Sequence, residues 1–175
     1  MLEQAGIEHR VKRPDVDEAA LKKAGADALD LARAKALAVS ARQPDDWVIG
    51  SDSMIDVGGR RFDKPADRVQ AAEHLRFFSG KAIILTSAVA LARGGKVDWS
   101  MADEAQLQVR ALSDAFIDTY LDAEWPDVAY CVGVFRMEGR GIQLFDSVEG
   151  SHFTILGMPL LPLLGALRER GLVAA

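Results

Sequence analysis

The segment Gly50-Ser51-Asp52-Ser53 places a carboxylate directly after a short apolar run. That run, from Trp47 to Gly50, has the β-branched content of a buried strand. Ligand sites in open α/β sheets lie at the carboxyl ends of strands, and the small neighbours of Asp52 would let a phosphate or a metal ion come close. The segment therefore predicts a phosphate or metal site, with a simple turn-forming aspartate as the alternative.

Two lysines could supply positive charge to such a site. Lys64 comes after the hairpin that is predicted to follow Asp52, and it approaches Asp52 if that hairpin folds back. Lys35 lies among small alanines in the middle of the first predicted helix. An ammonium group stabilises a phosphoryl group as a point charge. For each lysine, an exposed surface position is the alternative.

Further carboxylates could complete the chemistry. Asp17-Glu18 could reinforce a metal site, because Mg²⁺ prefers one or two carboxylates together with phosphate oxygens of the substrate; a helix N-terminal acidic pair is the alternative. Glu138 lies in Glu138-Gly139-Arg140-Gly141, where glycines could admit a ligand close to the backbone. Its carboxylate could accept hydrogen bonds from a base edge, and a plain turn between strands is the alternative.

The elements that must position these residues alternate along the chain. Helices and strands interleave, while several strands are joined by tight glycine turns, so the sequence predicts an α/β fold with a mixed sheet. The expected helices span residues 18–42, 66–78, 114–121 and 159–170, and the expected strands span 47–50, 54–57, 60–62, 82–92, 97–110, 129–137, 142–148 and 153–156.

Composition narrows the function classes. A chain of 175 residues fits one domain, residues 1–175. The net charge of -5 and the pI near 5.2 argue against a nucleic-acid-binding surface. The single cysteine, Cys131, fits a reducing compartment. No signal peptide or membrane-length apolar stretch is present, so we expect a cytoplasmic, soluble protein. The P-loop and dinucleotide-binding fingerprints are also absent.

The order of several segments resembles the Maf family of nucleoside triphosphate pyrophosphatases, over nearly the whole chain. Val16-Asp17-Glu18 is similar to the family's acidic segment, and Leu31-Ala32-Arg33-Ala34-Lys35-Ala36 to its Leu-Ala-x-x-Lys-Ala helix. Gly50-Ser51-Asp52 and Lys64-Pro65 resemble the central aspartate and the Lys-Pro that follows it. The later matches, in the family's order, are Ser79-Gly80, Glu149-Gly150 and Gly157-Met158-Pro159-Leu160.

This resemblance implies a strongly twisted sheet flanked by helices and a hydrolase that depends on a divalent cation, Mg²⁺ or Mn²⁺. The enzyme would split a nucleoside triphosphate into the monophosphate and pyrophosphate. Asp52 would activate the attacking water, directly or through the metal, and Glu18 would help to hold the metal. Lys35 and Lys64 would contact phosphates. The resemblance also allows a homodimer and implies neither nucleic-acid nor membrane partners.

Departures from the family pattern bear on the substrate. The dTTP- and UTP-hydrolysing branch has Thr after the central aspartate and Gln-Gly near the later glycines, where this chain has Ser53 and Glu138-Gly139. Residues 131–142 are more similar to the branch that hydrolyses 7-methyl-GTP, and a carboxylate at Glu138 suits the N–H donors of guanine. The favoured substrate is therefore a modified nucleotide of that kind, removed by a house-cleaning enzyme, with Ser53 and Glu138 as substrate-binding residues.

One feature of the family, an N-terminal strand with a phosphate loop, has no matching residues in this sequence. Family members begin with a strand followed by a Ser-x-Ser-x-x-Arg phosphate loop, and Met1–Ile7 aligns just after that loop. We therefore expect this chain to lack the N-terminal strand and loop. The competing functional hypothesis is a non-catalytic, nucleotide-binding protein associated with cell division and septum formation.

Overall fold

The computed structural model describes residues 1–174 and divides the chain into two compact units. The first unit comprises Met1–Ser53, Ser87–Asp103 and the C-terminal segment from His152. The second unit comprises Met54–Thr86 and Glu104–Ser151. None of the helices within residues 1–174 is long and apolar enough to cross a membrane.

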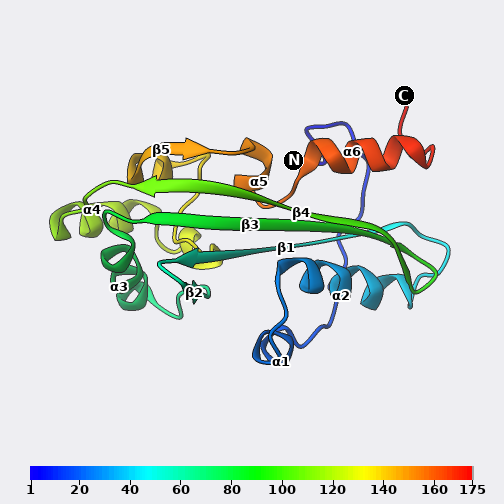
Figure 1. Cartoon of the computed structure of the whole chain (residues 1–175), viewed down its shortest axis with the longest axis horizontal. Helices are drawn as coiled ribbons and strands as arrows, with labels where there is room; N and C mark the ends of the chain where they lie inside the picture. The colour runs from blue at the N-terminus through cyan, green and yellow to red at the C-terminus, as the bar shows by residue number, and fades with distance from the viewer. Residues whose placement is uncertain (175) are drawn as a thin grey trace. The chain divides into compact units, whose positions relative to one another are not determined.

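Five strands form one sheet in the order β2-β1-β3-β4-β5 (Figure 1). The strands are β1 (Val48–Val57), β2 (Arg60–Phe62), β3 (Ala82–Arg93), β4 (Lys96–Val109) and β5 (Phe145–Glu149). The hairpin β1–β2 turns at Gly58 and Gly59, whose φ angles of 63° and 80° suit the twist of a two-residue turn. The hairpin β3–β4 turns at Gly94 and Gly95, and β4 pairs with β5 in antiparallel register.

The α/β class is confirmed, but the sheet is antiparallel where the sequence predicted a mixed one. A parallel pair needs a crossover that carries the chain back to the start of the first strand. Here the connection from β2 through α3 (Arg68–Phe78) lies entirely in the second unit. The chain therefore enters β3 at the end where β1 finished, and the two strands run in opposite directions (Figure 1).

The helix predicted over residues 18–42 is two helices, α1 (Glu18–Lys23) and α2 (Ala28–Ser40). Gly25 breaks the pattern with a φ of 95°, a conformation that side-chain-bearing residues rarely adopt. A capping box between Asp27 and Asp30 then starts α2. The break leaves α1 free to lie at its own angle, with Glu18 in its first turn.

In the first unit both faces of β1 are covered. A side chain at Gly50 would overlap the backbone of Ala32 and lie 2.6 Å from the nitrogen of Ala36, so α2 packs directly on this face. On the opposite face, Ile49 packs against the apolar cluster built around α6 (Leu160–Glu169), the helix predicted at 159–170. Alternate residues of β1 therefore face different helices.

The second unit contains α3, α4 (Asp114–Glu124) and two short 3₁₀ helices, η1 (Asp127–Tyr130) and η2 (Arg140–Leu144). The helix α3 packs against α4. Asp67 and Ser113 cap these helices through their side chains, which confirms both predicted helices to within a few residues at their ends.

Two strand predictions were wrong and one was half right. Residues 129–137 form the end of η1 and a turn, because Val134 adopts a left-handed conformation with a φ of 55°. Residues 153–156 lie in α5 (His152–Ile155) and the turn that follows. The strand predicted at 142–148 begins only at Phe145, after η2. Each of these apolar runs is too short for its period to separate strand from helix or turn.

Candidate functional site

Asp52 lies inside β1 and not at its carboxyl end, which corrects the prediction from the sequence. The strand continues through Asp52 to Val57, and the run Gly50-Ser51-Asp52-Ser53 is extended backbone throughout. Because side chains alternate along a strand, Asp52 shares a face with Gly50, the face on which α2 packs. Strand pairing on the sheet, and not a flexible turn, therefore fixes the position of this carboxylate.

Lys35 of α2 bridges two carboxylates. Its Nζ donates to Asp52 Oδ1 at 2.5 Å and lies 3.0 Å from Glu18 Oε1. The Lys35 and Asp52 side chains are only 17% and 10% exposed, whereas Glu18 is 41% exposed. The structure thus brings together three of the predicted site residues, from α1, α2 and β1. We call Glu18, Lys35 and Asp52 the carboxylate–lysine cluster.

Asp17 and Glu18 have separate tasks in α1. The Asp17 side chain caps the helix by accepting a hydrogen bond from the amide of Ala20 at 2.9 Å. Glu18, one residue further on, reaches Lys35. The helix-cap alternative is therefore true of Asp17, and Glu18 belongs to the cluster.

Partial burial sets the electrostatics of the cluster. Burial raises the pKa of the Asp52 carboxyl, and the hydrogen bond and charge of Lys35 only partly offset that effect. Burial alone would lower the pKa of Lys35, but its hydrogen bonds to Asp52 and Glu18 and their charges outweigh burial and raise it. Lys35 therefore stays cationic at neutral pH, and Asp52 is a stronger base than an exposed aspartate.

One oxygen of the cluster has no partner among the described residues. Asp52 Oδ2 is buried and has no hydrogen-bond partner among the described residues. A buried carboxylate oxygen without a partner is costly, and such exceptions in a folded chain call for an explanation. A metal ion or a water bound at this atom would supply the missing interaction.

The donor set fits a hard divalent cation. Residues 1–174 contain no group of three or more His, Cys, Asp and Glu side chains arranged to hold a metal by themselves. Mg²⁺ does not need such a cage, because it keeps waters and binds through one or two carboxylates plus substrate phosphates. Asp52 Oδ2 and the half-exposed Glu18 carboxylate are donors of this kind.

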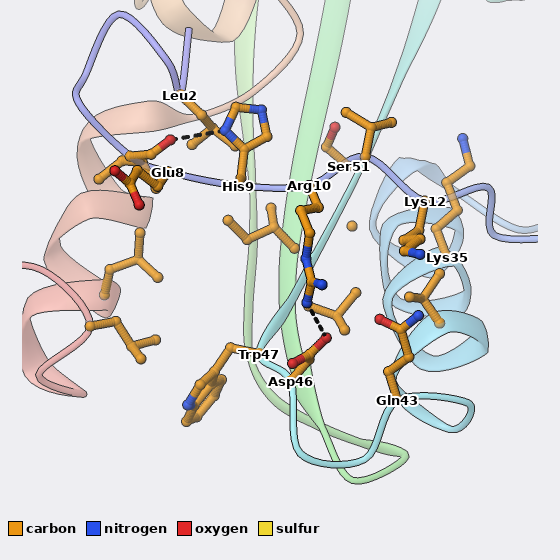
Figure 2. A pocket seen from close by; sticks show the side chains of 18 of the residues that line it. Leu2, Glu8, His9, Arg10, Lys12, Lys35, Gln43, Asp46, Trp47 and Ser51 are labelled. Carbon is orange, nitrogen blue, oxygen red and sulfur yellow. Dashed lines mark hydrogen bonds and ion pairs between the residues drawn. The ribbon is translucent and has the colours of Figure 1, made fainter.

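A cavity of about 850 Å³ in the first unit is lined by Lys35 of the cluster (Figure 2). The β1 residues Val48 to Ser51 also line it, together with Leu167 of α6, apolar residues that flank this helix and apolar residues of the N-terminal segment. Arg10 and Lys12 line it as well, and Arg10 donates to Asp46 at 3.1 Å. Sequence reasoning missed these cations, although the run His9-Arg10-Val11-Lys12-Arg13 was a visible signal.

Ser53 lies on the face of β1 opposite Asp52. Its hydroxyl is 2.7 Å from the Ser87 hydroxyl and donates to the carbonyl of Gly157 at 3.3 Å. Ser87 in turn donates to the carbonyl of Thr154 at 2.7 Å. These bonds join β1 to the segment between α5 and α6, so the structure does not bring Ser53 together with the cluster.

Lys64 and Glu138 belong to the second unit, and both side chains are exposed. Their charges act in opposite senses on the pKa of Cys131, which burial raises above its usual value.

Sequence reasoning also missed Glu124, the last residue of α4, whose side chain is 6% exposed. It accepts hydrogen bonds from Arg136 Nη2 at 3.0 Å and from the backbone amide of Arg140 at 3.3 Å. Nothing in its local sequence separates it from the other acidic residues of this helix.

Comparison with known proteins identifies the family. A family model described as Maf-like protein matches residues 1–170. The chain is 44% identical to a protein of Rhizobium etli named 7-methyl-GTP pyrophosphatase, over 99% of this chain and 91% of the relative.

Two further relatives are named nucleoside triphosphate pyrophosphatase. The protein of Bradyrhizobium diazoefficiens is 43% identical over 99% of this chain and 89% of the relative. That of Paramagnetospirillum magneticum is 46% identical over 98% of this chain and 92% of the relative. The carboxylate–lysine cluster thus occurs in a chain that belongs to the Maf-like protein family.

Proposed function

We propose that this chain hydrolyses a nucleoside triphosphate to the nucleoside monophosphate and pyrophosphate, with Asp52 as the base that activates water. The observation that carries the proposal is the carboxylate–lysine cluster, in which Asp52 Oδ2 is buried and unpartnered beside a cation. The names of the relatives support the same reaction class.

The reaction can be written for this cluster. Water held at Asp52 Oδ2 gives a proton to that oxygen as its own oxygen attacks the α-phosphorus. The bond between the α-phosphorus and the bridging oxygen breaks, and the electron pair leaves with pyrophosphate. The raised pKa of Asp52 favours the proton transfer, because a catalytic base works best with a pKa nearer to the working pH.

Lys35 supplies the positive charge that this reaction needs. Phosphoryl and nucleotidyl transfer depend mainly on positioning and on cations that stabilise the charge spread over the phosphate oxygens. The ammonium of Lys35 is held by Glu18 on one side and Asp52 on the other, and it lines the cavity. A triphosphate entering the cavity would meet a cation that is already oriented.

In the alternative in which Asp52 acts through a metal, a divalent cation, Mg²⁺ or Mn²⁺, would be held by Asp52 Oδ2 and Glu18 together with phosphate oxygens of the substrate, and Oδ2 would then be a metal ligand and not the base. When bound, it would add positive charge at the scissile phosphate and lower the pKa of a bound water. Lys64 would contact the phosphates as a further cation, a role inferred from its Lys-Pro segment.

Within this reaction we propose 7-methyl-GTP or a similar modified nucleotide as the preferred substrate. Relatives of both printed names have similar identities to this chain, so identity alone does not choose between them. The choice rests on Glu138, an exposed carboxylate that could accept from the ring and exocyclic N–H donors of a guanine edge.

The experiment is a pyrophosphate-release assay with Mg²⁺ or Mn²⁺ across 7-methyl-GTP, GTP, dTTP and UTP. The matched control for Asp52→Asn is Asp98→Asn, because Asp98 is also an ion-paired aspartate of the first unit, bound to Arg170 and outside the cavity. We expect release that is highest with 7-methyl-GTP, absent in Asp52→Asn and retained in Asp98→Asn.

Thermal unfolding with the same nucleotides separates an enzyme from a binding protein. A ligand that binds the folded chain raises its apparent stability whether or not turnover follows. Stabilisation by a nucleotide without pyrophosphate release would contradict the catalytic proposal and favour the non-catalytic nucleotide-binding hypothesis. Release with dTTP or UTP above 7-methyl-GTP would contradict only the substrate assignment.

A further inference from the structure

The segment that carries Glu138 is a closed loop. The amide of Gly139 donates to the carbonyl of Arg136 at 3.2 Å. A side chain at Gly141 would lie 2.7 Å from the nitrogen of Arg136, so the two ends of this loop, residues 136–141, touch through their backbones. Glu138 therefore projects from a loop that has little freedom to rearrange.

The buried carboxylate of Glu124 holds this loop on both sides of Glu138. Glu124 Oε2 accepts from Nε and Nη2 of Arg136, at 3.3 and 3.0 Å. Glu124 Oε1 accepts from the amide of Arg140 at 3.3 Å. A side chain added at Gly139 would lie 3.0 Å from Glu124 Oε2, so the loop backbone lies directly against the carboxylate.

A second residue of α4 fixes the segment that leads into the loop. Tyr120 lies one helical turn before Glu124, on the same face of α4, and its hydroxyl donates to the carbonyl of Val134 at 2.9 Å. Val134 is fully buried with a φ of 55°, a strained conformation for a β-branched residue. Strain of this kind persists only where the surroundings enforce it, and it concentrates at functional segments.

We propose that Glu124 is a positioning residue for nucleotide selectivity: it clamps Arg136 and Arg140 and thereby fixes the orientation in which Glu138 meets the base. This inference rests on the proposed function for the role of Glu138, but the clamp itself does not. Selectivity is thus set by a buried side chain of α4 that does not touch the nucleotide.

The test compares Glu124→Gln with Asp122→Asn. The glutamine side chain would keep the shape but turn an NH₂ group towards either the Arg136 guanidinium or the Arg140 amide, so that a donor would face a donor. Asp122 is an acidic residue of the same helix whose carboxylate pairs with Arg68 on the surface, where it is 74% exposed. Asp122→Asn therefore makes the same change from carboxylate to amide, at a side chain that pairs with Arg68 and not with the loop.

The first readout is independent of any nucleotide. Cys131 is the only cysteine of the chain and is half-buried at the start of this segment. We expect maleimide labelling of Cys131 to be about tenfold faster in Glu124→Gln, because losing bonds to a charged group favours local opening. Unchanged labelling, or equal acceleration in Asp122→Asn, would overturn the clamp.

The second readout is the KM and kcat of each nucleotide. In Glu124→Gln we expect KM for the preferred nucleotide to rise about tenfold and the ranking among nucleotides to flatten, with kcat within about twofold of the parent chain. A ranking that is unchanged while labelling is faster would overturn the selectivity role. If the parent chain released no pyrophosphate with any nucleotide, the proposed function would fail. The labelling rate of Cys131 would still show whether Glu124 holds the loop in place.

If Glu124→Gln does not fold, Arg136→Lys provides a second test, in which the ion pair between Arg136 and Asp127 is changed as well. Lysine keeps the charge but loses the planar guanidinium that binds Glu124 through two nitrogens. The clamp predicts faster labelling of Cys131 in this variant as well, and labelling at the parent rate would contradict it.

Discussion

Asp52 and Glu124 are two buried carboxylates, one in each unit, and both pair with a cation. Both oxygens of Glu124 accept hydrogen bonds, from the Arg136 side chain and the Arg140 amide. Asp52 has one oxygen on Lys35 and one without a partner among the described residues. Glu124 is saturated by its own chain, whereas Asp52 retains capacity for a ligand.

This difference indicates which of the two ion pairs, Asp52–Lys35 or Glu124–Arg136, takes part in a reaction. A satisfied buried pair contributes to the positioning of the chain, because removing either member leaves the other unpaired. A buried carboxylate with an unpaired oxygen costs free energy in the free protein, and bound water, metal or substrate can recover it. Function is therefore expected at Asp52 and structural positioning at Glu124.

The largest expected effect is the loss of turnover in Asp52→Asn. Removing a general base lowers the rate by about 10²–10⁴-fold, and the neutral amide of the same shape should leave the fold intact, with Lys35 still bound to Glu18. Pyrophosphate release and the unfolding midpoint are measured together. Near-normal turnover in this variant would mean that the unpaired oxygen has no catalytic role.

Lys35→Met should reduce both turnover and stability. The variant leaves Asp52 and Glu18 without their shared cation, and breaking a buried ion pair costs about 3–5 kcal/mol, with the lower value expected for a partly exposed pair. Urea unfolding gives the free energy. A stability equal to that of the parent chain would show that Lys35 does not compensate the buried charge.

Glu124→Gln should lower the stability of the chain and leave its turnover nearly unchanged, which is the reverse of the result expected for Asp52→Asn. Its hydrogen bonds involve charged groups, which contribute about 1.5–3 kcal/mol each, so the free energy of unfolding should fall by an amount of that order. The catalytic rate constant should stay close to that of the parent chain. If turnover fell as far as in Asp52→Asn, the distinction between the two carboxylates would be wrong.

Gly50→Ala tests how the Asp52 carboxylate is positioned. The added methyl group would meet the backbone of α2 at Ala32 and Ala36, so the helix must shift. Overpacking of this kind costs about 1–3 kcal/mol and should move Lys35 away from Asp52, which lowers turnover more than nucleotide binding. Parent-like turnover would show that the close approach of α2 is not needed.

The smallest expected effect is on the pH dependence of stability. Because the folded pKa of Asp52 is raised above its ordinary value of 3.8, the folded chain takes up this proton before the unfolded chain does. Above the folded pKa, the charged Asp52 carboxylate destabilises the folded chain. This destabilisation is lost as the pH falls from the folded pKa of Asp52 towards 3.8, because the folded chain is protonated first. In metal-free buffer the parent chain should gain stability relative to Asp52→Asn on acidification, and a relative loss would contradict the raised pKa.

The sequence predicted the helices and long strands where caps and glycine turns were explicit. Ser113, Gly58-Gly59 and Gly94-Gly95 each act locally, so a single chain reveals them. The turn at Val134 was missed because its left-handed conformation depends on tertiary contacts, including the bond from Tyr120. The strand predicted from Trp47 ended too early, at Gly50, because Ser51, Asp52 and Ser53 have low strand propensity. Tertiary packing overrides that propensity and continues the strand through Asp52.

The candidate site was predictable in its residues but not in its geometry. The family resemblance singled out Glu18, Lys35 and Asp52, which the structure brings together. The break at Gly25 that lets α1 lie apart from α2, and the unpartnered state of Asp52 Oδ2, are properties of packing. Glu124 could not be singled out for the same reason, since its partners Arg136 and Arg140 lie beyond the end of its helix and reach it only through packing.

The measurement that tests the central claim most directly is hydrolysis of the preferred nucleotide in ¹⁸O-labelled water, with mass analysis of both products. Activation of water at Asp52 for attack on the α-phosphorus predicts equal amounts of monophosphate and pyrophosphate, with the label in the monophosphate alone. Label in pyrophosphate, or release of orthophosphate with a nucleoside diphosphate, would contradict the account.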